Sequence, residues 1–273
     1  LGSYLAKKLL EKGYSVINFD LNKPKDISNL KFFKKGNILD KKRLVSCTKN
    51  VDIVFHFAGM ADIDQANKFP ADSLNLNING TINVLEACVK NKVKKLIFAS
   101  SIYALSEQGG FYSKSKLSSE MIIEQYSKKY KFDFIVLRFG SLYGGKANKF
   151  NSIGKYIEQA INSKKIVRFS DGEEVRNYIF IEDAMEICAN LVKAEFRNQH
   201  LNLFGKKKVK VKKVLKLIKN IFNAKELLFK NKKYEYHYKV NPYTLKIKKG
   251  KNLYPKREAN LREALKKINN EYK

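Results

Sequence analysis

The chain has 273 residues, of which 44% are apolar and 12% aromatic. This composition excludes a disordered polymer, and the length allows one full-sized domain with a smaller lobe. No stretch approaches the roughly 20 consecutive apolar residues of a membrane span. Cys47, Cys88 and Cys188 lack the spacing of a disulfide framework or a metal site. We therefore expect a soluble, cytoplasmic protein with no membrane association and no metal.

Basic residues outnumber acidic residues 55 to 26, which gives a net charge of +29 at pH 7. Only seven of the basic residues are arginine, the residue that nucleic-acid recognition favours. An excess of Lys, Asn, Ile, Tyr and Phe also arises from AT-rich coding sequence without selection for a ligand. The excess is concentrated in residues 201–273, which hold 23 basic and 5 acidic side chains. We do not expect a nucleic-acid partner, but a basic C-terminal surface that contacts a polyanion is kept as an alternative.

In the first half of the chain, helix patterns alternate with strand patterns. Leu1, Leu5, Leu9 and Leu10 recur at helical spacing up to Gly13. The elements expected after this helix are strands at 14–19, 32–36 and 51–57, a helix at 74–92, a strand at 93–99, a helix at 112–129 and a strand at 132–138. Units of about 30 residues are typical of βαβ crossovers, so we expect an α/β fold with a doubly wound parallel sheet.

Beyond residue 144 the alternation is less regular. The elements expected there are a helix at 149–163, strands at 165–169 and 178–181, and helices at 183–193, 209–221 and 258–270. We expect residues 1–143 and 178–195 to form the larger, nucleotide-binding domain, and residues 144–177 and 196–273 to form a smaller substrate-binding lobe.

In a doubly wound sheet, ligands bind where the strands end at their carboxyl edge. Asp20 follows the first strand pattern, where a carboxylate would accept hydrogen bonds from an adenosine ribose; an ordinary turn aspartate is the alternative. The small residues of Phe57-Ala58-Gly59 follow a buried strand and would let the backbone approach a dinucleotide, although a tight turn would explain them equally. We expect His56 to be a packed histidine at a strand end.

The most informative constellation is Ser101 at the end of a buried strand, followed by Tyr112 and Lys116. Tyr112 and Lys116 are four residues apart, so on a helix they share one face. An ammonium group beside a phenol stabilises the phenolate, and we expect the pKa of Tyr112 to be lowered towards neutrality. The position of Tyr112 distinguishes it from Tyr4, which has the same spacing to Lys8 but follows no strand-end serine.

Several motifs occur together in a fixed order. They are Asp20, Asn37-Ile38, HFAG (56–59), NINGT (77–81), FASS (98–101), YSKSK (112–116), LRFGSLYG (137–144) and VRNYIFIED (175–183). This set resembles the extended short-chain dehydrogenases/reductases. It looks most like the nucleotide-sugar 4-epimerases typified by UDP-glucose 4-epimerase, from residue 1 to about residue 190.

The resemblance implies a Rossmann-type sheet, in which Gly2 would be the last glycine of the phosphate-binding turn. The first strand of that sheet would then be missing from the chain, together with the other two glycines. Loss of this strand would leave its neighbours without hydrogen-bonding partners and would weaken NAD binding.

The resemblance also implies roles for single residues. Ser101, Tyr112 and Lys116 would be catalytic, with Lys116 also binding the nicotinamide ribose. The residues implied to bind NAD are Gly2, Asp20, Asn37, Ile38, Phe57, Ala58, Gly59, Asn77, Tyr112 and Lys116. The residues implied to bind the substrate are Ser101, Ser141, Asn151 and Arg176.

The implied function is NAD-dependent epimerisation of a nucleotide-activated sugar through a keto-sugar intermediate, in surface-polysaccharide precursor synthesis. A homodimer through helices near 74–92 and 112–129 is implied as well. A dehydratase is disfavoured, because Ser101-Ile102-Tyr103 stands where such enzymes have Thr-Asp-Glu. Ala61, the short 101–112 connection and Gly140-Ser141 depart from the epimerase pattern. A reductase or dehydrogenase of the same family, or a non-catalytic dinucleotide-binding protein, therefore stays open.

Overall fold

The computed structural model describes residues 1–23, 33–144, 152–193, 195–230, 251–255 and 259–271. Its main sheet has five strands in the order β12-β9-β5-β4-β3, and every neighbouring pair is parallel. The strands are β3 (Ile53–His56), β4 (Lys95–Ser101), β5 (Asp133–Phe139), β9 (Gln199–Leu203) and β12 (Lys251–Leu253). Helices connect most of these strands, as a parallel sheet requires. The expected α/β fold with a doubly wound parallel sheet is confirmed.

The two central strands are buried on both faces, because alternate side chains enter different cores. On β4, Leu96 and Phe98 belong to one apolar cluster, and Ile97 and Ala99 belong to the other. β5 repeats this alternation and is buried along nearly its whole length. This explains why both strands appear in the sequence as continuous apolar runs.

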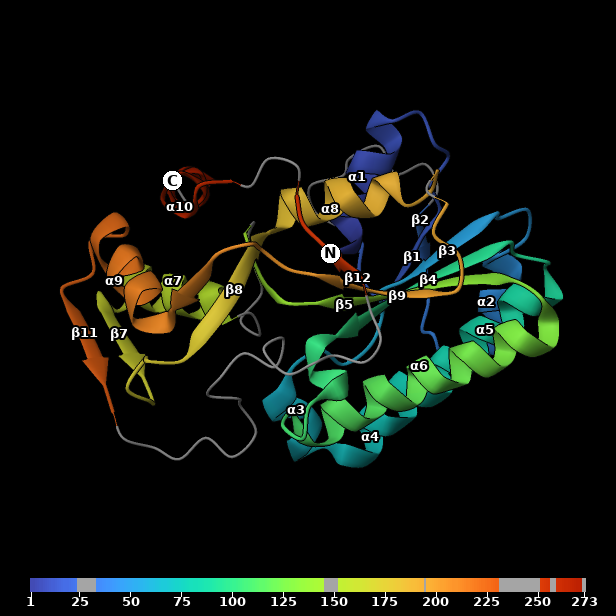
Figure 1. The fold of residues 1–273 in the computed structure, drawn as a ribbon, viewed down its shortest axis with the longest axis horizontal. Helices are drawn as coiled ribbons and strands as arrows, with labels where there is room; N and C mark the ends of the chain where they lie inside the picture. Colours follow the sequence, from blue (N-terminus) through green and yellow to red (C-terminus); the bar gives the residue numbers. More distant parts are fainter. Residues whose placement is uncertain (24–32, 145–151, 194, 231–250, 256–258, 272–273) are drawn as a thin grey trace.

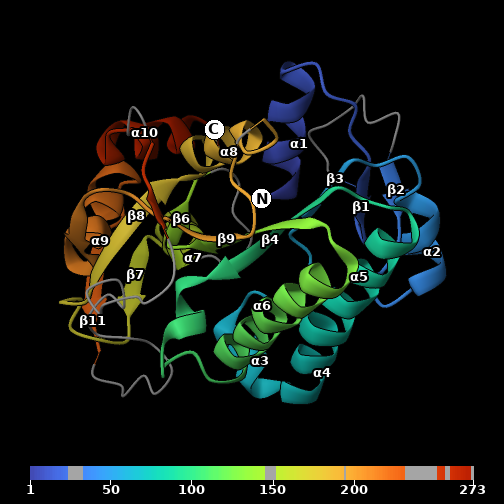
Figure 2. The same ribbon diagram turned by 45° about the vertical axis from the view of Figure 1, so that its right-hand side comes forward.

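Helices cover both faces of the sheet (Figure 1). α2 (Lys41–Cys47), α5 (Gly80–Lys90) and α6 (Gly110–Tyr130) pack on one face, and α1 (Gly2–Glu11) and α8 (Ile181–Asn190) pack together on the other. Figure 2 shows the same two helical layers from a different angle. The short helices α3 (Ile63–Lys68) and α4 (Pro70–Leu74) and a π-helical turn, η1 (Asn75–Asn79), lead into α5.

β1 (Asn18–Asp20) and β2 (Phe33–Lys35) form a separate parallel pair that is not hydrogen-bonded to β3. In the described part of the chain, β3 pairs only with β4.

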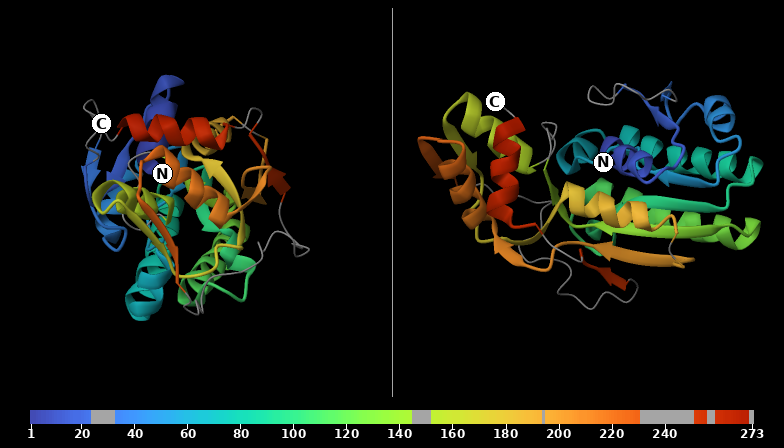
Figure 3. Two further views of the ribbon diagram at one scale, coloured as in Figure 1. Left: turned by 90° about the vertical axis from the view of Figure 1, so that its left-hand side faces the viewer. Right: turned by 90° about the horizontal axis from the view of Figure 1, so that it is seen from above.

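The remaining elements gather beside the sheet (Figures 1 and 3). They are β6 (Ser141–Tyr143), β7 (Lys165–Arg168), β8 (Val175–Phe180), β10 (Lys208–Lys210) and β11 (Glu226–Phe229), with helices α7 (Ser152–Asn162), α9 (Val211–Ile221) and α10 (Leu261–Glu271). β8 pairs with β6 and β10, and β7 pairs with β11.

Two strands differ from the expected division, in which residues 196–273 belong wholly to the lobe. β9 and β12 lie in the main sheet, where Leu201 and Leu203 of β9 are fully buried beside β5. Residues 201–203 (LNL) are too few for their hydrophobic periodicity to assign them to a sheet. None of the described helices is long and apolar enough to cross a membrane.

Candidate active site

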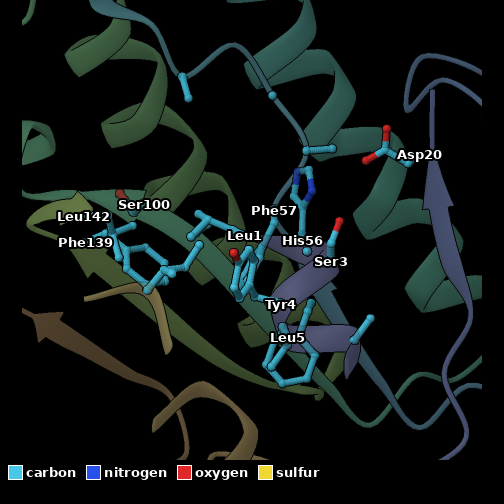
Figure 4. Close-up of a pocket in the computed structure, with 18 of the residues that line it drawn as sticks. Leu1, Ser3, Tyr4, Leu5, Asp20, His56, Phe57, Ser100, Phe139 and Leu142 are labelled. Carbon is cyan, nitrogen blue, oxygen red and sulfur yellow. The ribbon is translucent and has the colours of Figure 1, made fainter. Parts of the chain in front are cut away.

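A large cavity of about 1860 Å³ opens at the carboxyl edge of the main sheet. Its wall includes the ends of β3, β4 and β5 and also Arg168, Arg176 and Val211 from the elements beside the sheet. Part of the volume is the groove between β1 and β3, because Ile53 and Val54 also line it. Asp20 lies at one end of the view in Figure 4, and Ser100, Phe139 and Leu142 lie at the other.

Ser101, Tyr112 and Lys116 all line this cavity, and all three are buried. Ser101 is the last residue of β4, and its hydroxyl hydrogen-bonds the phenol of Tyr112. The Ser101 Oγ also accepts the backbone N–H of Tyr103 at 3.2 Å, in the short 3₁₀ helix η2 (Ile102–Leu105). The expected convergence of these three side chains at one site is therefore present.

Lys116 is held inside the protein rather than in solvent. Its Nζ donates to the Ala99 carbonyl at 2.9 Å and lies 4.9 Å from the centroid of the Phe98 ring. Burial lowers the pKa of Lys116 to about 8, against an opposing effect of the Glu120 charge. This lysine is therefore close to losing its charge near neutral pH.

Tyr112 differs from the expectation that its pKa is lowered. Burial raises the pKa of Tyr112, and the hydrogen bond from Ser101 opposes this only in part. The reason is that helical spacing brings Lys116 to the same wall but does not fix where its ammonium group points. That group is directed to Ala99 and Phe98.

Gly59 and Asn77 build the loop that faces Lys116. Gly59 has a φ of +149°, and a Cβ there would lie 2.7 Å from the Asn77 Oδ1 and 3.8 Å from the Lys116 Nζ. The Asn77 side chain accepts the Met60 N–H at 2.7 Å and donates to the Met60 carbonyl at 3.1 Å. Asn77 is not among the residues that line the cavity; it shapes this loop, and its implied contact with the dinucleotide stays a prediction.

At the opposite end, Asp20 is exposed and lines the cavity. Its Oδ1 accepts the backbone N–H of Asn22 at 3.0 Å, which leaves its second oxygen available for a ligand. Ile38 lines the cavity too, but Asn37 does not, and the Asn37 Oδ1 accepts the backbone N–H of Leu39. These contacts do not support the implied contact of Asn37 with adenine, which stays a prediction.

Gly2, Phe57, Ala58, Ser141 and Arg176 line the cavity as expected. The guanidinium of Arg176 donates to the Val175 carbonyl at 2.9 Å. Asn151 lies outside the described residues.

His56 is packed as predicted: it is 4% exposed, and burial lowers its pKa to about 3.

Sequence reasoning missed two supports of the site. Asn67 accepts the backbone N–H of Phe111 at 3.0 Å and so caps the start of the helix that carries Tyr112. Glu120 and Arg138 form a buried ion pair behind Ser101, with an N–O distance of 2.6 Å. Glu120 lies four residues after Lys116, but only the structure shows that it meets a side chain from β5.

A cavity at the carboxyl edge of a parallel sheet, with an exposed carboxylate at one end and a buried serine, tyrosine and lysine at the other, defines a dinucleotide-dependent enzyme class. Comparison with known families agrees, because residues 1–203 match the NAD dependent epimerase/dehydratase family. The chain belongs to this family.

Its relatives include both epimerases and dehydratases. A putative UDP-glucose 4-epimerase of Methanocaldococcus jannaschii is 25% identical over 99% of this chain and 94% of its own length. A dTDP-D-glucose 4,6-dehydratase of Dictyostelium discoideum is 32% identical, over 57% of this chain and 42% of its own length. The crystal structure of UDP-glucose 4-epimerase from Thermotoga maritima with UDP-glucose matches with a TM-score of 0.83 and 25% identity, covering 99% of this chain and 94% of that one.

The cavity of this chain fits NAD. Asp20 supplies an acceptor for a ribose hydroxyl, and Gly2 in the first turn of α1 lines the cavity. Gly59 leaves open the space that a Cβ would fill beside Lys116. The cofactor of the family therefore matches side chains at both ends of the cavity.

Proposed function

We propose that the protein is an NAD-dependent epimerase of a nucleotide-activated sugar, of the 4-epimerase type, acting through a keto-sugar intermediate. The observation that carries this proposal is the meeting of Ser101, Tyr112 and Lys116 at one corner of the cavity. The similarity to UDP-sugar 4-epimerases over nearly the whole chain supports the reaction class.

In this reaction the chain's own residues hold the sugar and move its proton. Ser101 hydrogen-bonds the reacting sugar oxygen, and Tyr112 takes the proton from that oxygen and later returns it. Lys116 lies one helical turn from Tyr112 on the same wall, and its ammonium group, which donates to the Ala99 carbonyl in this structure, would offset the charge on the phenol after turning from that carbonyl. NAD, when bound, supplies the hydride acceptor and donor at the sugar carbon. Arg176 and Ser141 face the cavity from β8 and β6, where we place the substrate diphosphate.

The residues after Ser101 favour epimerisation over dehydration. A dehydratase needs an acid and a base beside the reacting hydroxyl. In this chain Ile102 is buried, and the ring of Tyr103 packs edge-on to Tyr112 with a centroid distance of 6.4 Å. Neither side chain supplies a carboxylate, so the sugar carbon would be oxidised and reduced without loss of water.

The test is turnover of UDP-, GDP- and dTDP-sugars with NAD, using Tyr112→Phe as the catalytic variant. We expect the wild type to interconvert one sugar pair. Tyr112→Phe should lower kcat by about 10² to 10⁴, the usual contribution of a general acid or base, while NAD binding persists. Tyr103→Phe is the matched control, since it removes a neighbouring phenol from the same cavity.

Two other outcomes would replace this proposal. Net consumption of NAD or NADH with one sugar would make the protein a reductase or dehydrogenase. Absence of turnover together with salt-sensitive binding of a polyanion would favour the non-catalytic alternative, with contacts in residues 201–273.

We also propose a homodimer that pairs α5 and α6 with their copies. Support comes from the apolar side chain of Met121 in the middle of α6, which is 60% exposed. Light scattering of the wild type and of Met121→Glu tests this assembly.

A cytoplasmic location and a role in surface-polysaccharide precursors complete the proposal. The location is consistent with three free cysteines, and the role rests on the substrate class alone.

A further inference from the structure

A buried carboxylate that the proposed reaction does not use lies directly behind the catalytic corner. Glu120 is 1% exposed and sits on α6 one turn after Lys116. An ionised carboxylate in this position is costly to bury unless hydrogen bonds and opposite charges surround it. The side chains that hydrogen-bond or pair with Glu120 therefore indicate its role.

Glu120 joins helix α6 to three strands. It accepts a hydrogen bond from the Ser100 hydroxyl on β4, and from the Arg138 guanidinium on β5 at 2.6 Å (Nη2) and 3.0 Å (Nε). On β9, the His200 Nδ1 lies 3.5 Å from the Glu120 Oε2 and 2.9 Å from the Arg138 Nη2. Ser100 precedes Ser101, so this carboxylate holds the strand end that carries the substrate-binding hydroxyl.

The charge balance around Lys116 depends on the same carboxylate. Two buried cations, Lys116 and Arg138, flank Glu120. The Lys116 charge acts on His56 of β3, but His56 is itself neutral because burial lowers its pKa to about 3. Glu124, the next acidic residue on α6, is engaged by the His200 Nε2 at 2.7 Å. Glu120 is therefore the group that compensates the charge of Lys116 from within the protein.

We propose that Glu120 is a positioning residue of the active site: it keeps Lys116 cationic and fixes the end of β4 against α6. The contribution to turnover rests on the proposed epimerase function, whereas the effect on the charge of Lys116 does not. Burial already lowers the pKa of Lys116, and the Glu120 charge opposes this. Without Glu120, Lys116 would lose its proton at a lower pH and could no longer offset the charge on the Tyr112 phenol.

The test compares Glu120→Gln with Glu124→Gln, which removes the same charge one turn further along α6. NMR of protein labelled with [ε-¹³C]lysine reports the titration of Lys116, assigned by the signal missing from Lys116→Met. We expect the midpoint to fall by about one pH unit in Glu120→Gln, the usual size for loss of a nearby charge, and by about a third of that or less in Glu124→Gln.

Turnover gives a second readout. In a plot of kcat against pH, activity should fall at the alkaline side. In Glu120→Gln, this fall should move to lower pH by the same amount as the Lys116 titration midpoint measured by NMR. At pH 7, kcat should fall by about twofold, because the protonated fraction of Lys116 falls from about nine-tenths to about one-half; well above pH 8 the fall should approach tenfold, with KM changed less than threefold. A purely structural role would lower the amount of folded protein without moving the pH at which activity falls.

Glu120→Gln leaves Arg138 buried without its carboxylate, which can prevent folding. The double variant Glu120→Gln/Arg138→Met removes both charges and keeps the volume filled, so it provides a folded form without the carboxylate. A Lys116 midpoint that is the same in folded Glu120→Gln as in the wild type, or the same in the double variant as in Arg138→Met, overturns the proposal. If the wild type turns over no sugar, the proposed function fails, and the NMR titration still decides the effect of Glu120 on Lys116.

Discussion

The two ends of the cavity are built in different ways. At the reaction end, Ser101, Tyr112 and Lys116 are each less than 9% exposed, and buried polar groups support them from behind. At the end where we propose that adenosine binds, Asp20 and Asn37 are exposed, and their side chains accept backbone N–H groups of their own turns. Substitutions at the first end should change folding stability and activity together, whereas those at the second should change ligand affinity alone.

The physical reason is the cost of burial. A group that is desolvated in the native state has a free energy that depends on its neighbours, so its titration is linked to folding. An exposed group has similar surroundings in the folded and unfolded chain. The experiments below test this contrast between the ends, and the largest effects are expected at the buried end.

The largest effect should come from His56, which is buried against Thr81 with a 3.0 Å hydrogen bond. Its pKa is about 3 in the native protein and 6.5 in a free side chain. Above pH 6.5 both states are neutral. As the pH falls from 6.5 to 3, only the unfolded state binds the proton, so stability is lost, up to about 5 kcal/mol in all at 1.36 kcal/mol per unit.

Urea unfolding of the wild type and His56→Gln between pH 7.5 and 4.5 measures this loss. Glutamine can still donate to Thr81, so the two proteins should be similar above pH 7. The wild type should lose stability relative to the variant below pH 6.5. A difference that stays constant over this range would show that His56 titrates in the native state as it does in solvent.

Lys116 should be destabilising at neutral pH. Its pKa is about 8 in the native protein against 10.5 in a free lysine, so the charged form costs about 3 kcal/mol below pH 8. Lys116→Met should therefore raise the free energy of unfolding by up to about 3 kcal/mol at pH 7 while it abolishes turnover. The gain should shrink from pH 8 upwards and vanish above 10.5, where both states are neutral.

Lys114→Met is the matched control for this change, because Lys114 lies on the same helix and is exposed. It should change stability by at most about 0.5 kcal/mol. Thermal and urea unfolding at pH 7 and 9.5 separate the two variants. Equal effects of both substitutions would mean that burial of Lys116 carries no energetic cost.

Asn77 tests the support of the Gly59 loop. Asn77→Ala removes two hydrogen bonds to the Met60 backbone and one to the Ser115 hydroxyl at 2.9 Å. A buried backbone N–H left without a partner costs about 1–3 kcal/mol, and we expect a loss of about 2 kcal/mol in stability with weaker NAD binding. Asn79→Ala, which removes only an exposed contact with Asn75, should cost less than about 0.5 kcal/mol.

The sequence predicts the fold well because buried parallel strands and amphipathic helices leave strong patterns. β4, β5 and α6 all lie within a few residues of their expected positions. The short helices α3 and α4 were missed, since five or six residues do not establish a helical period. β9 and β12 were missed as sheet strands because pairing with β5 is a long-range contact that no local pattern records.

The residues of the site were predictable by type and order, but their orientation was not. Tyr112 and Lys116 could be placed on one wall from their spacing. The turn of Lys116 towards Ala99, the use of Asn77 for the Met60 backbone and the position of Glu120 behind Ser100 depend on contacts between elements far apart in the chain. These contacts decide the pKa values. The expectation that the pKa of Tyr112 is lowered was therefore wrong.

The smallest effect should come from Asp20, at the exposed end. The Asp20→Asn side chain can still accept the Asn22 N–H, so stability should change by less than about 0.5 kcal/mol. Loss of the carboxylate acceptor should weaken NAD binding about tenfold, or about 1.4 kcal/mol. Loss of the carboxylate should also reduce the preference for NAD over NADP, because a carboxylate repels the 2′-phosphate.

Calorimetric titration with both dinucleotides measures these changes in affinity. Asn37→Ala is the control, because Asn37 does not line the cavity. Equal losses of NAD affinity in the two variants would show that the Asp20 carboxylate does not bind the ribose. The two ends of the cavity would then differ only in how deeply their side chains are buried.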